Sequence, residues 1–330
     1  FIFLFFVNSK LFVLNKKSTK ESSDDKKYMT DDDLQIASVL MDPNKGEIKA
    51  IAGGKDYSKS EYNRVISSKR QVGSTIKPFL YYAALENGFT PSTTFTSEKT
   101  NFNLGNGKSY SPKNYNDVYA NSPISMSAAI AYSDNIYAIK THIFLGEETL
   151  VNMALKLGIK TKLTPNISLA LGTDDINILE MMKAYSTFAN GGYSIKPHFI
   201  KKVEDIRGNV LYKFKDDSSL ILDESNVYVL NELLTSSYDS NLLDYNTPTC
   251  LGIAPKISQK YAIKTGNHPD VFTRQNIQGF KKQFLFFFNK YLYAPSDTKL
   301  SNAIPIPNII AIPVRVGTQI FEIYSKNAVP

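Results

Sequence analysis

Few residues in the sequence could build a disulfide, a metal site or a histidine-dependent site. Cys250 is the only cysteine of the 330 residues, so no disulfide can form within the chain. His142, His198 and His268 are the only histidines, and they follow no metal-ligand spacing. A serine–histidine–aspartate triad is therefore disfavoured, and we predict no metal and no cofactor.

Apolar runs long enough to cross a membrane are also missing. Phe1–Val7 is strongly apolar, but residues 8–10 interrupt it with polar side chains, and a spanning helix needs about 20 residues. Two interpretations stay open: the remnant of an anchor or signal segment, and an irregular end of a fragment that begins with Phe rather than Met. Residues 15–33 are polar and charged and are predicted to be a linker.

The overall composition is that of a globular protein with a basic surface. Hydrophobic residues make up 42% and charged residues 21%, which argues against disorder. The net charge of +7 fits a surface near an anionic wall polymer or lipid, and it fits a lysine-rich solvated surface as well. We predict no nucleic-acid partner.

From Leu34 onward the sequence alternates between strand and helix patterns. Residues 34–54 and 193–214 are predicted to form β-hairpins, 260–263 a short strand and 90–121 a loop. Strands near both ends with helices between them indicate an α+β fold, a sheet layered with helices. Helices are predicted over residues 74–88, 122–131, 135–144, 147–157, 175–189 and 224–236.

Three short motifs occur in order along the chain. They are Ser74-Thr75-Ile76-Lys77 at the start of a predicted helix, Ser133-Asp134-Asn135 between two helices, and Lys264-Thr265-Gly266 at the end of a strand. Each motif alone often arises by chance. Together, in this order and context, they form the signature of penicillin-binding proteins and class A β-lactamases.

Ser74 and Lys77 have the spacing of a nucleophile and its base. A serine hydroxyl is a poor nucleophile until a base takes its proton, and residues three apart on a helix share a face. Lys77 can be that base only when its amine is neutral, a form that burial and a second cation, Lys264, would favour. Gly73 lets the chain turn into the helix, whose first N–H groups can face an oxyanion.

The remaining motif residues suit proton transfer and substrate binding. Ser133 can bridge the two lysines and pass a proton to a leaving amine, and Asn135 offers an amide to the backbone of an acyl donor. Lys264 and Thr265 suit a terminal carboxylate. Gly266 leaves room for a substrate that lies along the edge of the strand as an added strand.

Longer stretches around the motifs resemble the transpeptidase domain of class A high-molecular-mass penicillin-binding proteins. They are Gly53–Gly88, Ser111–Asn135 and Ser168–Ile200, and the resemblance extends over about Leu34–Gly266. It implies a central antiparallel sheet flanked by helices, as in β-lactamases. The chain would then divide into an apolar start and linker (1–33), a transpeptidase domain (34–266) and an unmatched tail (267–330).

The resemblance also implies an activity. The chain would be an extracytoplasmic, membrane-associated DD-transpeptidase that cross-links peptidoglycan stem peptides, with other cell-wall synthesis proteins among its partners. Ser74 would attack a D-Ala-D-Ala terminus, release D-Ala and pass the acyl group to an amine, and β-lactams would trap the same serine. The backbone N–H groups of Ser74 and Asn267 would stabilise the oxyanion.

Two features depart from the family pattern. Class A proteins carry a glycosyltransferase domain before this one, and residues 1–33 do not match it. The family usually has Thr where Asn267 stands, followed by strands containing Trp, whereas this chain has no Trp. One interpretation of the tail is a frame shift or truncation just after Gly266, which would leave the sheet incomplete; a Trp-containing continuation in another reading frame would support it. The other is a divergent tail whose segment Phe284–Tyr293 supplies a sheet strand or contacts a membrane.

Other functions remain open beside the transpeptidase. A β-lactamase needs an efficient deacylating water, and Leu163–Leu171 offers no glutamate to drive one. A β-lactam-binding sensor also uses an acylated serine, so the intact Ser74 motif is compatible with it. An inactive pseudoenzyme is expected if the tail is frame-shifted.

Overall fold

The computed structural model describes the chain as two compact units. The first comprises Phe1–Asp270 and Lys282–Tyr293 and contains all three motifs. The second comprises Val271–Lys281 and Ala294–Pro330, and its strands β16 (Val314–Val316) and β17 (Gln319–Phe321) pair as a hairpin. The residues described are 2–9, 34–256, 260–267, 283–289, 314–316 and 319–321.

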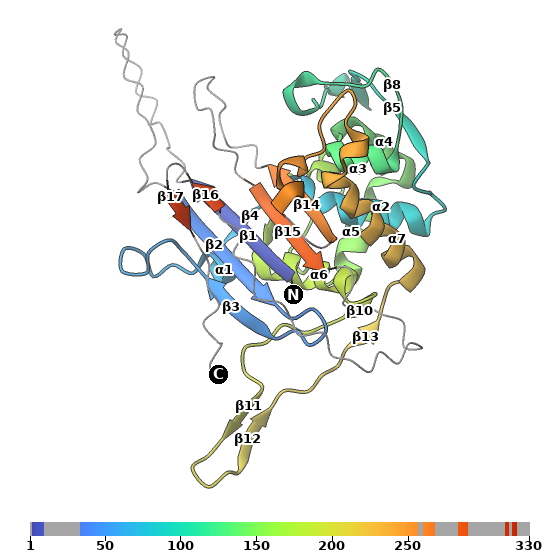
Figure 1. Cartoon of the computed structure of the whole chain (residues 1–330). Helices are drawn as coiled ribbons and strands as arrows, with labels where there is room; N and C mark the ends of the chain where they lie inside the picture. Colours follow the sequence, from blue (N-terminus) through green and yellow to red (C-terminus); the bar gives the residue numbers. More distant parts are fainter. Residues whose placement is uncertain are drawn as a thin grey trace. The chain divides into compact units, whose positions relative to one another are not determined.

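A five-stranded antiparallel sheet runs through the first unit (Figure 1). Its strand order is β14-β15-β1-β2-β3, so β14, which carries the third motif, lies at one edge. The first hairpin predicted from the sequence is β2 and β3, and it is confirmed. The strands are β1 (Ile2–Ser9), β2 (Leu34–Met41), β3 (Ile48–Ala52), β14 (Tyr261–Asn267) and β15 (Gln283–Asn289).

Segments from opposite ends of the sequence form the middle of this sheet. β1 pairs with β2 from Ile2 opposite Met41 to Ser9 opposite Leu34, and its other side pairs with β15. β15 in turn pairs with β14 along its whole length. β15 therefore supplies a strand of this sheet, which continues without a gap from β14 to β3.

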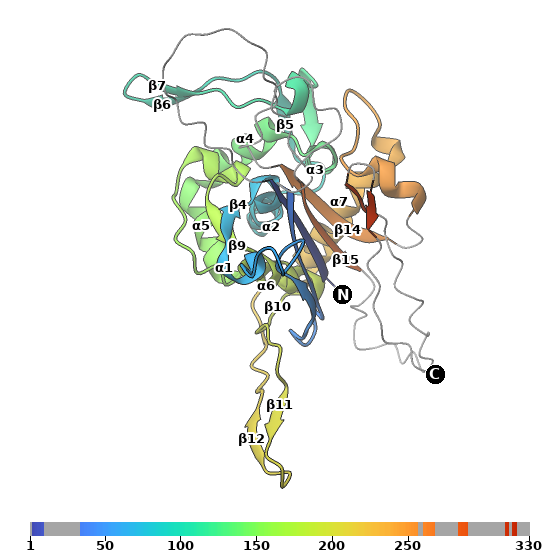
Figure 2. The same ribbon diagram turned by 90° about the vertical axis from the view of Figure 1, so that its left-hand side faces the viewer.

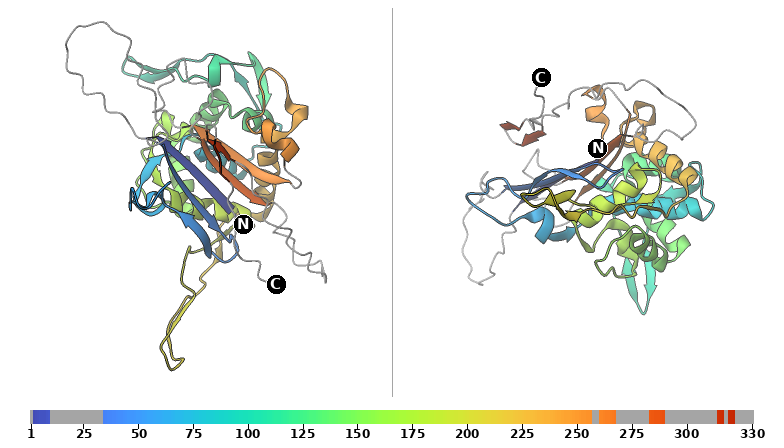
Figure 3. Two further views of the ribbon diagram at one scale, coloured as in Figure 1. Left: turned by 60° about the vertical axis from the view of Figure 1, so that its left-hand side comes forward. Right: turned by 90° about the horizontal axis from the view of Figure 1, so that it is seen from below.

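Helices pack against one face of the sheet. α6 (Ile178–Ala189) contacts β1 and β15, α7 (Glu224–Thr235) contacts β14, and the two helices contact each other. Figure 3 shows the blue and orange strands side by side with the helices behind them. The next layer is α2 (Lys77–Glu86), in which every residue except the last is buried, as expected of a helix at the centre of a core. The predicted α+β class, an antiparallel sheet with flanking helices, is confirmed.

Shorter elements complete the first unit. The predicted second hairpin is confirmed as β11 (Lys202–Glu204) and β12 (Val210–Lys213), and it projects away from the sheet and helices (Figure 2).

No helix in the described part of the chain is both long and apolar enough to span a bilayer. The other helices are α1 (Arg64–Ser67), α3 (Met126–Tyr132), α4 (Asn135–Leu145), α5 (Glu147–Lys156) and the 3₁₀ helices η2 (Gly73–Ile76), η3 (Tyr115–Asp117), η4 (Ile167–Leu171), η5 (Ser236–Tyr238), η6 (Ser240–Leu242) and η7 (Leu251–Lys256). The other paired strands are β4 (Lys69–Gln71) with β9 (Asp175–Asn177), β5 (Thr94–Ser97) with β8 (Ser122–Ser125), β6 (Phe102–Gly105) with β7 (Lys108–Tyr110), and β10 (Tyr193–Ser194) with β13 (Ser219–Leu220).

Two predicted helix starts and one predicted loop are wrong. Residues 122–125 form β8, and α3 begins only at Met126, where Ser125 Oγ caps the helix by accepting from Ala128 N. The predicted loop at 90–121 contains β5, which pairs with β8. In the same way β9 precedes α6 and pairs with β4. In each case pairing with another segment decides the structure rather than the local sequence signal, because the paired strands satisfy their backbone groups with each other.

Candidate active site

Ser74 lies in a tight turn directly before the central helix. The turn is η2, and its backbone is held from two sides. Gly73 N donates to Gly172 O at 3.0 Å, and Tyr185 Oη donates to Thr75 O at 2.7 Å. Gly73 has a φ of +56°, a left-handed conformation that glycine adopts at little cost. The side chain of Ser74 is half-buried, so it stays within reach of a substrate.

Lys77, the first residue of α2, is fully buried, and its amine is surrounded by acceptors. Nζ donates to Ser133 O at 2.7 Å, to Asp134 O at 3.1 Å and to Asn135 Oδ1 at 2.7 Å. Burial, and then the charge of Lys264, lower the pKa of Lys77 well below its usual value, while the charge of Asp134 opposes them. Burial and the charge of Lys264 thus favour the neutral amine that a base requires, whereas the three acceptors favour the ammonium form.

Ser133 Oγ lies between the two buried lysines. Lys264 Nζ donates to it at 2.9 Å, and Lys77 Nζ approaches it to 3.4 Å. Lys264 Nζ also donates to Thr265 O at 2.6 Å, and burial lowers the pKa of Lys264 to about 7. Ser133 ends α3 with a φ of +56°, a conformation uncommon for serine, and this sharp turn leads directly into α4.

Edge strand β14 packs against the turn that carries Ser74. A Cβ on Gly266 would lie 2.8 Å from Thr75 Cγ2 and 2.9 Å from Val72 O, which is closer than a side-chain carbon can come. The missing side chain therefore lets β14, with Lys264 and the buried Thr265, approach the turn. The sequence predicted room for substrate at Gly266, and the structure adds this packing role.

The three motifs come together at one edge of the sheet. Hydrogen bonds join the two lysines to Ser133, and Lys77 to Asn135. Ser74 precedes Lys77 by three residues, yet in the described part of the chain its hydroxyl makes no hydrogen bond to these side chains. Asn267, predicted to supply an oxyanion N–H, is the last residue of β14.

The sequence did not reveal two residues, Lys113 and Asn114, that form hydrogen bonds with Asn135 of the second motif. Asn135 Nδ2 donates to Lys113 O at 2.7 Å, and Asn114 Oδ1 accepts from Asn135 N at 2.8 Å. Both partners lie in the polar stretch that was predicted to be a loop. No local pattern distinguishes a polar loop residue that becomes buried from one that stays in solvent, so these contacts could not be found from the sequence.

The sheet, the helices on its face and the cluster of serines and lysines define a class of proteins in which an acyl group is carried on a serine. Within that class, the chain belongs to the penicillin binding protein transpeptidase domain family, whose model matches residues 36–271.

Individual relatives agree with this assignment. The chain is similar to penicillin-binding protein 2D of Bacillus subtilis (strain 168), with 45% identity over 235 residues, 71% of this chain and 34% of that protein. It is also similar to the crystal structure of penicillin-binding protein 1A from Haemophilus influenzae, with a TM-score of 0.67, 26% identity, and coverage of 77% of this chain and 42% of that one. The imipenem acyl-enzyme complex of penicillin-binding protein A from M. tuberculosis shares the fold, with a TM-score of 0.58, 16% identity and coverage of 77% and 68%. The chain thus spans 34% of the length of the first relative.

Proposed function

We propose that this chain is a peptidoglycan DD-transpeptidase domain, a serine acyltransferase that penicillin acylates on Ser74. One observation carries the proposal: Ser133 Oγ lies within reach of both Lys77 and Lys264, two buried amines with lowered pKa values. Burying amines is unfavourable for stability, and strongly perturbed groups cluster at functional sites. Membership of the transpeptidase family supports the same activity.

The proposed reaction begins when neutral Lys77 takes the proton of Ser74. The serine oxygen bonds to the carbonyl carbon of the penultimate D-Ala, and the N–H groups of Ser74 and Asn267 stabilise the oxyanion. The C–N bond to the terminal D-Ala breaks, and its amine leaves with the proton, which passes from Lys77 through Ser133. An amine of a neighbouring stem peptide then attacks the ester, forms the new amide and returns a proton to Ser74.

The donor peptide is proposed to bind along β14. This strand is at the edge of its sheet, so one side of its backbone is open to an added strand. Lys264 and Thr265 suit the terminal carboxylate of the peptide by charge and by hydroxyl. Asn135 has one N–H beyond the bond to Lys113 O, and this N–H suits the backbone of the acyl donor.

We place the reaction outside the cytoplasm and in association with the cell membrane. Its partners would be a donor stem peptide ending in D-Ala-D-Ala, an amine-bearing acceptor stem and other cell-wall synthesis proteins. β-Lactams would resemble the donor and remain attached to Ser74. A sensor, a β-lactamase and an inactive pseudoenzyme differ from this proposal in the fate of the acyl group.

A fluorescent penicillin is expected to label the wild-type protein on Ser74 and to stay bound for many minutes. Label is followed by gel fluorescence over time, and its position by mass spectrometry of peptides. Ser74→Ala should take no label, because it lacks the nucleophile, whereas the exposed serine variant Ser58→Ala should label like the wild type.

Each alternative gives a different result. Rapid loss of label would indicate a β-lactamase, and absence of label from the wild type would indicate a pseudoenzyme. Stable label is shared with a sensor, so the second measurement is release of D-Ala from a D-Ala-D-Ala pentapeptide in the presence of an amine acceptor. Release with transfer to the acceptor supports the transpeptidase, and stable label without release contradicts it.

A further inference from the structure

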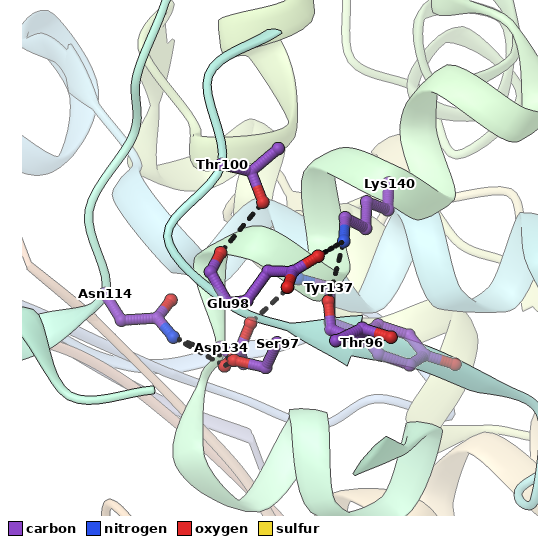
Figure 4. Close-up of polar contacts among 8 residues, drawn as sticks. All are labelled: Thr96, Ser97, Glu98, Thr100, Asn114, Asp134, Tyr137 and Lys140. Atoms are coloured by element: carbon purple, nitrogen blue, oxygen red, sulfur yellow. Dashed lines mark hydrogen bonds and ion pairs between the residues drawn. The ribbon is translucent and has the colours of Figure 1, made fainter. Parts of the chain in front are cut away.

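A buried asparagine forms hydrogen bonds with the turn of the second motif, Ser133-Asp134-Asn135. Asn114 comes just before η3, in the stretch between β7 and β8, and its side chain is buried. Figure 4 shows Asn114 and Ser97 beside the carboxylate of Asp134. Asn114 has no hydrogen bond to Ser74, Lys77 or Lys264 in the described part of the chain; its bonds reach Lys77 only through Asp134 and Asn135.

The amide of Asn114 holds the start of α4. Oδ1 accepts from Asn135 N at 2.8 Å and from Ile136 N at 3.3 Å, and Nδ2 donates to Asp134 Oδ2 at 2.6 Å. Asp134 Oδ1 accepts from Tyr137 N at 2.8 Å. The first three N–H groups of the helix, which have no partner within it, are thus satisfied by two side chains. This arrangement fixes Asn135 at the first position of the helix.

The same turn supplies the acceptors around Lys77. Asn135 Oδ1 and Asp134 O both accept from Lys77 Nζ, so any movement of the turn changes two contacts of the amine. Asp134 also acts through its charge, which favours the protonated form of Lys77. Four donors bind the carboxylate and offset part of that charge: Asn114 Nδ2 at 2.6 Å, Ser97 Oγ at 2.5 Å, Tyr137 N at 2.8 Å and Tyr245 Oη at 3.4 Å.

Within the described residues, few other charged groups face Lys77 and Asp134. Lys264 on β14 opposes the protonation of Lys77. Tyr81 of α2, Tyr137 of α4 and Tyr245 also surround Asp134 or adjoin it. Burial raises the pKa of each of these tyrosines, so they stay neutral at working pH. The pKa of Lys77 therefore depends mainly on its burial and on the charges of Lys264 and Asp134.

We propose that Asn114 is a positioning residue for acyl transfer, because it holds Asp134 and Asn135 where together they fix the amine of Lys77. The inference rests on the function proposed above. Asparagine suits the place because one planar group offers both an acceptor for the two N–H groups and a donor for the carboxylate. Ionised aspartate lacks the donor.

Exchanging the side chains of Asn114 and Asp134 tests this inference. Asn114→Asp adds a second negative charge near Lys77, which favours the charged amine. The acid limb of the pH profile for Ser74 acylation by penicillin should rise by about one pH unit, and acylation below that limb should slow about tenfold. In the double variant Asn114→Asp with Asp134→Asn, the number of charges and the bond between the two side chains are restored with the partners exchanged, while Val118 O loses its donor, so the limb and the rate should move back toward the wild-type values.

The control is another buried asparagine. Asn231 on α7 donates to Phe188 O of α6 at 2.9 Å, a residue outside the three motifs. Asn231→Asp should lower the melting temperature but leave the acid limb in place. If Asn114→Asp also lowers only the melting temperature, Asn114 has a structural role alone and the inference is wrong. If that single variant does not fold, Asp134→Asn alone should lower the limb and the double variant should raise it again; a limb that stays lowered overturns the inference.

A titration that needs no acylation separates this inference from the proposed function. The protonation of Lys77 can be followed by NMR of ¹⁵N-labelled lysine side chains, with Lys77→Met to identify the signal. A wild type that takes no label, with a Lys77 midpoint that moves and returns as expected, would reject the function and keep the positioning role. Normal labelling with an unmoved midpoint would keep the function and reject the role of Asn114.

Discussion

A Lys77→Met variant is expected to acylate Ser74 about 10²–10⁴-fold more slowly than the wild type, the range associated with loss of a general base. Methionine fills a similar volume with an apolar chain, so the buried site should remain packed. The three acceptors around Nζ lose their donor, and some stability should be lost with it. The measurement is the second-order rate of labelling by fluorescent penicillin, with the melting temperature taken alongside.

Lys140→Met provides the matched control. Lys140 is half-buried on α4 and donates to Thr96 O at 2.8 Å, but it does not belong to the motif cluster. This variant should label at the wild-type rate. A Lys77→Met protein that folds and labels within a few-fold of the wild type would show that another group takes the proton from Ser74.

A Gly172→Ala variant is expected to slow acylation by roughly 100-fold, because it displaces the turn that carries the nucleophile. Gly172 has a φ of +71°, and a Cβ there would lie 2.6 Å from Gly73 N and would overlap the carbonyl oxygen of Gly73. Since Gly73 N donates to Gly172 O, the two backbones cannot separate without losing this bond. Ser74 follows Gly73 directly, so the displacement reaches the reacting oxygen.

Gly88→Ala is the control that separates the steric clash at Gly172 from the strain of a positive φ angle. Gly88 also has a positive φ, +84°, but a Cβ there meets nothing within 4 Å. Alanine at Gly88 should cost about 1–2 kcal/mol of stability, the usual penalty of a left-handed conformation, with an unchanged acylation rate. Equal acylation rates in the two alanine variants would mean that the turn tolerates the added carbon.

Much of the candidate active site could be proposed from the sequence because its residues are marked by short spacings. Ser74 and Lys77 are three residues apart, and Ser133 and Asn135 are two apart, so a helix and a tight turn are enough to place them. The apolar residues of α2 indicated a helix, and the structure confirms it. Lys264 could be assigned to the site only through the family signature, because nothing local to it indicates what its strand packs against.

Long-range contacts account for what the sequence did not reveal. The pairing of β5 with β8 moved the start of α3 from Ser122 to Met126, although Ser125 offers the same kind of cap. Asn114 is one of many polar residues in its stretch, and only the folded chain shows it bonded to Asp134. The places of β1 and β15 depend on each other as strand neighbours, so neither could be assigned alone.

The pairing of β1 with β15 has a consequence for the order in which the protein folds. Helices α2 and α4 form from local contacts, whereas this pairing closes a loop of almost the whole described chain and therefore carries a large entropic cost. We expect the amides of α2 to gain protection in pulsed hydrogen exchange before those of β14, and simultaneous protection would contradict this order. Lys77 would then be in place early, and Lys264 would join it only when the last strands pair, so a nascent chain would have its nucleophile and base before it could bind a substrate.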